Sequence, residues 1–199
     1  TWDAAVNWTT DTLPSAPFKV SITPNAGVTV AGPAANTIVR GLVVDAGLTG
    51  STMLNLNSGA SLKVNGALQV GDNGLVTLTS GTLEANTILN NGVISGSANT
   101  AIVGATIVND GVFTHRGTLN TFGLVVNNGA FNLLQGTASV NAIDGSGSTT
   151  ISAGVTVTAD RARQSSLTLG GRLNLRPYEF IPVLTRFGTL SLGPTAGID

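Results

Sequence analysis

Few side chains in this sequence are able to do acid–base or nucleophilic chemistry. His115 is the single histidine, and the only carboxylate within one repeat length of it is Asp110. Serine and threonine are abundant, but a hydroxyl becomes a catalytic nucleophile only beside a general base. We therefore expect His115 to be an exposed residue next to Arg116, without a catalytic role.

Metal-ion and glycosidase chemistry also lack the residues they require. With one histidine and no cysteine, zinc and iron sites are short of ligands. Calcium needs clustered carboxylates, and Asp72 and Asp110 occupy equivalent positions two repeats apart, with Asn91 between them. Glycoside hydrolysis needs two carboxylates about 5–10 Å apart across one cleft, whereas Asp72 and Glu84 could share a turn only on different faces. The sequence predicts no catalytic, metal or cofactor site, and it predicts that the chain is not an enzyme.

The charge content argues against nucleic acid and membrane partners. The formal net charge is -1 and only 10% of the residues are charged, so there is no electrostatic footprint for nucleic acid. We expect the five basic residues near the C-terminus to lie apart on a solvated face; they are Arg161, Arg163, Arg172, Arg176 and Arg186. No apolar run reaches the roughly 20 residues of a transmembrane helix.

Two further sets of side chains suggest binding without catalysis. Trp2 and Trp8 could stack on sugar rings, but near the end of a repeat domain we expect them to cover its core. Thr-x-Thr steps, as at 77–79 and 156–158, resemble those of flat ice-binding faces. They do not recur in one column over many repeats, so the sequence does not predict such a face.

Four Asx-Gly steps reveal an internal repeat. The glycines are 18, 19 and 18 residues apart, and each follows two Asn or Asp residues. The glycines are Gly74, Gly92, Gly111 and Gly129. An apolar residue stands four positions before each glycine, namely Val70, Ile88, Ile107 and Val125. Another stands two positions after it, namely Val76, Ile94, Phe113 and Phe131.

A turn of about 18 residues fits three short strands joined by three tight corners. Turns stacked at the inter-strand spacing of about 4.8 Å place equivalent residues directly above one another. We therefore expect the two apolar rows to form interior stacks, and the Asx-Gly steps to form a corner with positive φ. Asparagines at that corner should hydrogen-bond along the axis. Secondary corners are expected at Gly81, Gly96, Gly104, Gly117, Gly123 and Gly136.

Short strands bounded by Gly, Asn or Pro continue on both sides of the regular repeats. We therefore predict an all-β fold, a right-handed parallel β-solenoid with about 18-residue turns in a single domain. Left-handed hexapeptide solenoids would show a six-residue apolar period, which the irregular secondary corners disfavour. Residues 28–199 are expected to form the solenoid and residues 1–27 an N-terminal cap, whereas Asp199 follows a strand-like segment without a finished cap.

Both ends of the chain resemble a known family. Thr1-Trp2-Asp3, Asn7-Trp8 and Leu13-Pro14 are similar to the TWD…NW…LP start of autotransporter-like β-helix surface proteins of planctomycetes and related bacteria, often PEP-CTERM sorted. Residues 159–170 resemble the R-Q-x-x-L-T-(L/I)-x-G segment near the end of such domains, and so do Leu190-Ser191-Leu192 and Ala196-Gly197-Ile198-Asp199. The resemblance implies a β-helix at the cell surface that continues beyond Asp199, and it supplies no catalytic residues.

Together these observations predict a secreted, extracellular or cell-surface structural and interaction module. A stiff rod of this kind would serve as a surface-fibre subunit or an adhesin stalk, with homotypic head-to-tail association or surface glycans as partners. Head-to-tail contacts between identical subunits generate open filaments. The alternative is a polysaccharide-binding or polysaccharide-degrading β-helix protein.

Overall fold

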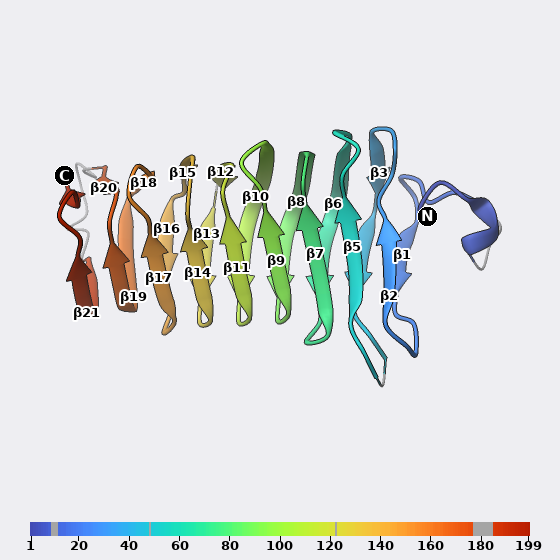
Figure 1. Ribbon diagram of the computed structural model, residues 1–199, viewed down its shortest axis with the longest axis horizontal. Coiled ribbons are helices and arrows are strands. Elements are labelled where there is room, and N and C mark those ends of the chain that lie inside the picture. Colours follow the sequence, from blue (N-terminus) through green and yellow to red (C-terminus); the bar gives the residue numbers. More distant parts are fainter. Residues whose placement is uncertain (9–11, 48, 122, 177–184) are drawn as a thin grey trace.

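The computed structural model describes residues 1–8, 12–47, 49–121, 123–176 and 185–199. The strands stack side by side into a β-solenoid of about nine turns in a single domain (Figure 1). Every pairing between strands is parallel. One 3-10 turn, η1 (Ala5–Asn7), is the only helical element among the described residues. The predicted all-β parallel solenoid is confirmed.

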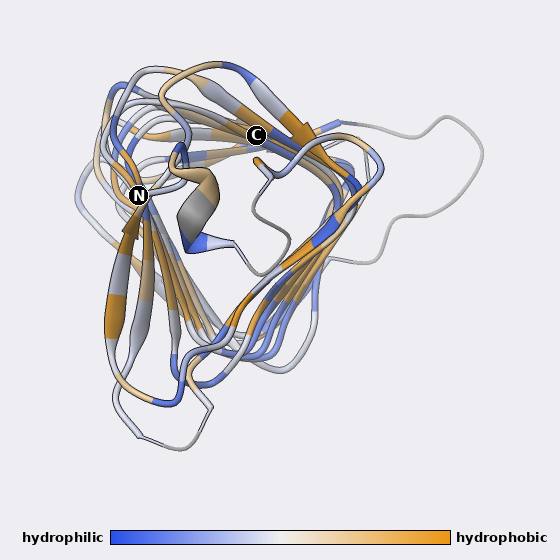
Figure 2. Ribbon diagram, turned by 90° about the vertical axis from the view of Figure 1, so that its right-hand side faces the viewer, coloured by the Kyte–Doolittle hydropathy of each residue, from blue (hydrophilic) through white to orange (hydrophobic). Residues whose placement is uncertain are grey.

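Each turn contributes to three faces, and Figure 2 shows the three-sided outline along the axis. Face 1 consists of β2 (Val28–Ala31), β5 (Thr52–Leu56), β7 (Gly74–Leu78), β9 (Val93–Gly96), β11 (Val112–His115), β14 (Ala130–Leu133), β17 (Ser148–Ile151), the second half of β19 (Arg161–Leu169) and β21 (Arg186–Leu192). Face 2 consists of β3 (Thr37–Val39), the first halves of β6 (Ser61–Val70), β8 (Gly81–Asn90) and β10 (Thr100–Asn109), then β12 (Thr118–Thr121), β15 (Thr137–Ser139), β18 (Thr156–Ala159), β20 (Arg172–Leu175) and β22 (Gly197–Ile198). Face 3 consists of β1 (Lys19–Ile22), β4 (Gly41–Val44), the second halves of β6, β8 and β10, then β13 (Leu124–Asn127), β16 (Ala142–Asp144) and the first half of β19.

Alternate residues of each strand point inward and form columns along the axis. One column of face 1 contains the predicted stack and extends it; it runs through Val30, Leu54, Val76, Ile94, Phe113, Phe131, Thr149, Leu167 and Leu190. Phe113 and Phe131 stack with ring centroids 4.9 Å apart. Full burial of such a side chain contributes about 1.5–3 kcal/mol, so the columns supply most of the driving force for folding.

The second predicted stack is confirmed only from Ile88 onward. Ile88, Ile107 and Val125 are in register, but Val70 pairs with Asn90, and Leu68 pairs with Ile88. The corner after Val70 is two residues longer than the corner after Asn90, so alignment on the glycines misplaced Val70 by two positions.

The Asx-Gly corner needs glycine for a different reason from the one predicted. None of its glycines has positive φ; the described glycines that do are Gly50, Gly59, Gly81, Gly136, Gly145 and Gly154. Instead, successive turns approach closely at this corner. A Cβ added at Gly111 would lie 2.1 Å from the carbonyl oxygen of Gly92, and one at Gly129 would lie 2.1 Å from that of Gly111. Any larger residue would push two turns apart.

The predicted secondary corners are confirmed in part. Gly81 and Gly136 have positive φ and directly precede or begin strands of face 2. Gly104 is the last face 2 residue of the unbroken strand β10 and directly precedes the bend toward face 3. That strand bends from face 2 to face 3 without a residue of positive φ.

A ladder of buried amides runs along the inside of the corner between faces 3 and 1, as predicted for the stacked asparagines. Asn90, Asn109 and Asn127 are all 0% exposed. The Nδ2 of Asn90 donates to Oδ1 of Asn109 at 2.6 Å, and Asn109 donates to Asn127 at 2.7 Å. Asn127 then donates to Oε1 of Gln164 at 2.7 Å. We call these four residues the amide ladder.

The amide ladder also joins face 3 of one turn to face 1 of the next turn. The same Nδ2 groups donate to backbone carbonyl oxygens of face 1, from Asn90 to Val112 and from Asn109 to Ala130, both at 3.0 Å. The Nδ2 of Asn90 and that of Asn109 therefore each donate to the next side chain of the ladder and to a backbone carbonyl oxygen of face 1. Buried polar groups satisfied in this way fix the register of the turns.

The described part of residues 1–27 lies at one end of the solenoid and includes β1, its first strand. Trp2 is 1% exposed and belongs to the core, and Trp8 packs edge-on against it with ring centroids 5.3 Å apart. The Nε1 of Trp8 donates to the carbonyl oxygen of Trp2 at 2.9 Å. The turn η1 lies over the end of the outline (Figure 2). β1 pairs with β4 and so belongs to face 3.

Replacing a corner glycine should destabilise the fold strongly. Gly111→Ala places a methyl group against the backbone of the preceding turn, so we expect a loss of at least about 3 kcal/mol in the free energy of unfolding. Gly41→Ala is the matched control, because its nearest neighbour would be a flexible lysine carbon at 3.4 Å. Denaturant unfolding measures both variants; equal, small losses would contradict the close-approach explanation.

Removing one member of the amide ladder should also be costly. Asn109→Ala removes one of the two acceptors of the Asn90 Nδ2 and leaves the buried Oδ1 of Asn127 without its donor, and we expect a loss of about 2–4 kcal/mol. Asn120→Ala, on the exposed outer surface of β12, should lose less than about 0.5 kcal/mol. Chemical denaturation monitored by circular dichroism compares the two, and similar values would refute a stabilising ladder.

Candidate functional site

The structure places His115 in the core, so the prediction that it is exposed beside Arg116 is wrong. Its side chain is 1% exposed and points inward between Gly96 of the preceding turn and Leu133 of the next. Gly96 makes room for the ring, because a Cβ there would lie 2.2 Å from Nδ1 of His115. The sequence signal was present: His115 stands two residues after the inward-facing Phe113.

The surroundings of His115 hold it in the neutral form. Its Nε2 lies 3.0 Å from the carbonyl oxygen of Thr118, which can only accept, so Nε2 carries the proton. Its Nδ1 is buried without a hydrogen-bond partner. Burial lowers the pKa of His115 below its ordinary value of 6.5. A neutral imidazole enclosed by core side chains cannot reach a substrate, so His115 is a structural residue.

The carboxylates that the sequence singled out are dispersed. Glu84 forms an ion pair with Lys63 on face 2, whereas Asp72 lies exposed in a corner. Asp110, also exposed, accepts a hydrogen bond from Nδ2 of Asn128 at 2.9 Å. Among the described residues, no three His, Cys, Asp or Glu side chains gather where they could hold a metal ion.

The arginines near the C-terminus are largely engaged with acidic neighbours. Arg161 binds Asp144 with a closest distance of 2.6 Å, and the hydrogen bonds that its guanidinium donates to that carboxylate raise the pKa of Arg161. Arg176 binds Asp160 at 2.8 Å. Arg172 binds Asp199 at 3.2 Å. Local pairing of this kind neutralises the charge that a polyanion would require.

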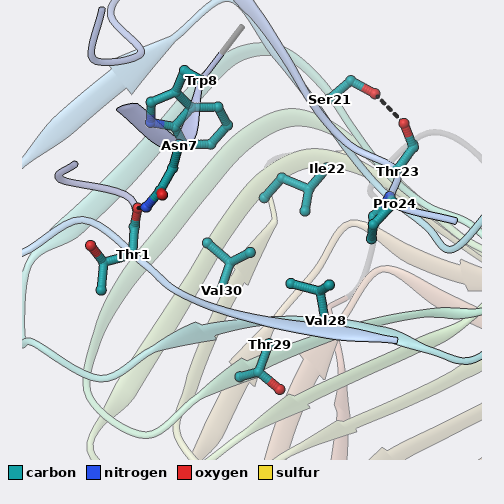
Figure 3. Close-up of a pocket in the computed structure, with 10 residues that line it drawn as sticks. All are labelled: Thr1, Asn7, Trp8, Ser21, Ile22, Thr23, Pro24, Val28, Thr29 and Val30. Carbon is teal, nitrogen blue, oxygen red and sulfur yellow. Dashed lines mark hydrogen bonds between the residues drawn. The ribbon is translucent and has the colours of Figure 1, made fainter. Parts of the chain in front are cut away.

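A pocket of about 490 Å³ opens at the N-terminal end of the solenoid (Figure 3). Its apolar side chains come from the first turn and the cap; they are Trp8, Ile22, Val28 and Val30. The polar groups at its rim are paired with one another: Nδ2 of Asn7 donates to the carbonyl oxygen of Thr1 at 2.8 Å, and the hydroxyls of Ser21 and Thr23 lie 3.3 Å apart. The pocket is thus the open end of the interior columns.

The outer surface of face 1 is more regular than the sequence indicated. Two outward columns cross its turns. One consists of Met53, Leu75, Val93, Val112, Ala130, Ser148, Ser166 and Thr189. The other consists of Asn55, Thr77, Ser95, Thr114, Asn132, Thr150, Thr168 and Ser191. Neither column contains a charged residue.

The second of these columns was hidden in the sequence because turn length varies. Asn55 and Thr77 are in contact at a separation of 22 residues, whereas Thr114 and Asn132 are in contact at 18. The Thr-x-Thr steps themselves do not share a column, as predicted: Thr77 lies on face 1, and Thr156 and Thr158 lie on face 2. Single hydroxyl and amide side chains nevertheless line face 1 from turn to turn.

Comparison of the chain with protein-family models, with curated proteins and with solved structures finds no match. The resemblance to autotransporter-like β-helix surface proteins therefore stays a prediction. Within the described part of the chain, no helix has the length and apolar character to cross a membrane. The features of the molecule that bear on its function are its outer faces and its two ends.

The buried histidine should make stability depend on pH. As the pH falls below about 6.5, the unfolded chain takes up a proton that the folded chain, with its lowered pKa, resists. The contribution of neutral His115 to the free energy of unfolding is therefore complete above that pH and is lost as the pH falls. His115→Leu, which matches its column neighbour Leu133, should reduce the loss of unfolding free energy between about pH 8 and about pH 5. An identical pH profile in the variant would contradict this assignment.

Proposed function

We propose that the chain is an extracellular structural and interaction module, a stiff solenoid rod that acts as a surface-fibre subunit or an adhesin stalk. The observation that carries the proposal is the continuous core. Inward columns run from the first turn to the last and form one buried cluster, and successive turns hydrogen-bond to one another on three faces. Such an array resists bending and local opening because no turn can leave without breaking ladders on both sides.

The surface of the rod supports a mechanical role. Its outer faces are built from short side chains, and the titratable groups are dispersed or locally paired. Inside the core, Asn90, Asn109, Asn127 and Gln164 are linked by the hydrogen bonds of the amide ladder. A site for chemistry would require perturbed groups converging on a cleft. Among the described residues the perturbed groups are His115, which is enclosed in the core, and Arg161, which is paired with Asp144.

The two ends supply surfaces for end-to-end association. Leu190 and Leu192 continue two interior columns, yet they are 43% and 59% exposed. At the other end, Val30 belongs to the same column as Leu190 and lines the open pocket. Stacking one copy on another would continue these columns and cover the exposed apolar groups. Contacts between different ends of identical subunits propagate into a filament.

A polysaccharide-binding rod is the second candidate. The observation that favours it is the half-buried indole of Trp8, which lines the pocket beside hydroxyl and amide groups. Aromatic faces with nearby hydrogen-bonding groups suit sugar rings. The outer columns of hydroxyls and amides on face 1 could add contacts along an extended glycan.

Fibre formation tests the leading proposal. Negative-stain electron microscopy of the purified chain over a concentration series should show unbranched fibres that lengthen as the concentration rises. Leu192→Asp places a charge in the end contact and should shorten the fibres, whereas Ile38→Asp, on the side of the rod, should not.

Short single rods at every concentration would refute the fibre form of the proposal. Binding of those rods to a glycan array, with quenching of the tryptophan fluorescence by the bound sugar, would then support the second candidate.

A further inference from the structure

Face 1 differs from the other two faces in carrying no charge on its outward columns. Face 2 presents Lys63 and Glu84 on neighbouring turns. Face 3 presents Asp144 and Arg161. The outward residues of face 1 are aliphatic toward the N-terminal half and short hydroxyl or amide residues elsewhere, and Val93 and Val112 are 37% and 39% exposed. Depletion of charge with exposed aliphatic groups is typical of the core of a protein interface.

We propose that face 1 is a lateral interface at which two copies of this chain pack side by side. The two copies are related by a two-fold axis that lies parallel to the rod, so each turn meets the same turn of its mate. This contact adds to the proposed structural role and does not require the end-to-end contact. It would convert a single rod into a double one.

Charge at the borders of face 1 selects this orientation. Exposed Asp110 precedes face 1 in the middle turn, and exposed Arg116 follows it in the same turn. A two-fold axis along the rod reverses the strand direction between mates, so Asp110 of each copy lies at the same border as Arg116 of the other. An axis along the strands would instead place Asp110 beside Asp110 and Arg116 beside Arg116 in the middle turn. Opposite charges at the rim favour the first arrangement.

The periodicity of face 1 selects a second copy as the occupant. Its outward side chains repeat at the strand spacing of about 4.8 Å over about nine turns. A partner fits along the whole length only if its own side chains repeat with the same rise and with the same irregular turn lengths. Sheets packed face to face lie about 10 Å apart, with side chains interdigitating. Under the two-fold axis, Val112 lies opposite Thr114 of the mate.

The size of the face is sufficient for a specific contact. A strip about five residues wide and about nine turns long covers on the order of 600 Å² per copy, or about 1,200 Å² for the pair. That area lies within the range of specific protein interfaces, which bury about 1,200–2,000 Å² in total.

Lysine substitution and sedimentation test the interface. The unmodified chain should sediment as a dimer in the micromolar range, and Val112→Lys should weaken the dimer at least about tenfold because it buries a charge. Thr118→Lys adds the same charge to the same turn on face 2 and should leave the mass unchanged. Thermal unfolding of both variants verifies that they are folded. A monomeric unmodified chain, or equal effects of the two lysines, would overturn the proposal.

Crosslinking tests the orientation, because the chain contains no cysteine and one introduced thiol is unique. With a bis-maleimide linker of about 10 Å, Val112→Cys and Met53→Cys should both give covalent dimers, since every turn faces its own mate. Thr118→Cys should remain monomeric. Crosslinking at Val112 but not at Met53 would overturn the parallel arrangement.

Electron microscopy separates this proposal from end-to-end association. Leu192→Asp should abolish long fibres and leave the lateral dimer, whereas Val112→Lys should leave fibres one rod wide. Loss of both assemblies in Val112→Lys alone would show that the two contacts are not independent and would overturn the lateral assignment.

Discussion

The close approach of successive turns at the corner between faces 3 and 1 is the constraint on which the rest of this structure depends. At the spacing of a parallel sheet, equivalent residues lie directly above one another, and backbone meets backbone where the chain reverses. The stacked glycines, such as Gly92 and Gly111, permit that contact because they have no side chain. The amide ladder lies immediately inside the same corner and fixes which residue follows which. Register at one corner then aligns all three faces.

A column tolerates an unusual residue in one turn when the residue in a neighbouring turn provides space or a hydrogen-bond partner for it. His115 replaces an aliphatic residue in its column, and Gly96 provides the space for the ring. Thr149 interrupts the column that contains Phe131, and its hydroxyl donates to Oε1 of Gln164 at 3.0 Å. These exceptions are local because a solenoid turn contacts only the turns on either side of it. A core of this kind is a linear stack that becomes longer with each added turn.

The same geometry determines what the surface can offer. Outward side chains repeat turn after turn, so a column without charge becomes a neutral strip, and charged groups gather on other faces and at the corners. Such a molecule has little capacity to build a concave site with convergent polar groups. It has a large capacity for extended contacts along its faces and at its ends. That difference is the basis of the proposed structural and interaction role.

The sequence by itself determined the class of fold, because Gly92, Gly111 and Gly129 recur with a nearly constant period and carry apolar neighbours at fixed offsets. Only the tertiary structure decided the register of the longer turns, where two extra residues after Val70 separate it from the apolar row with which it was aligned. It likewise decided that His115 lies inside and that the two outward columns of face 1 carry no charge. The physical reason is that local sequence patterns show the repeat period and the turn residues. The corners vary in length, so the residues that become neighbours between turns are known only once the turns are stacked.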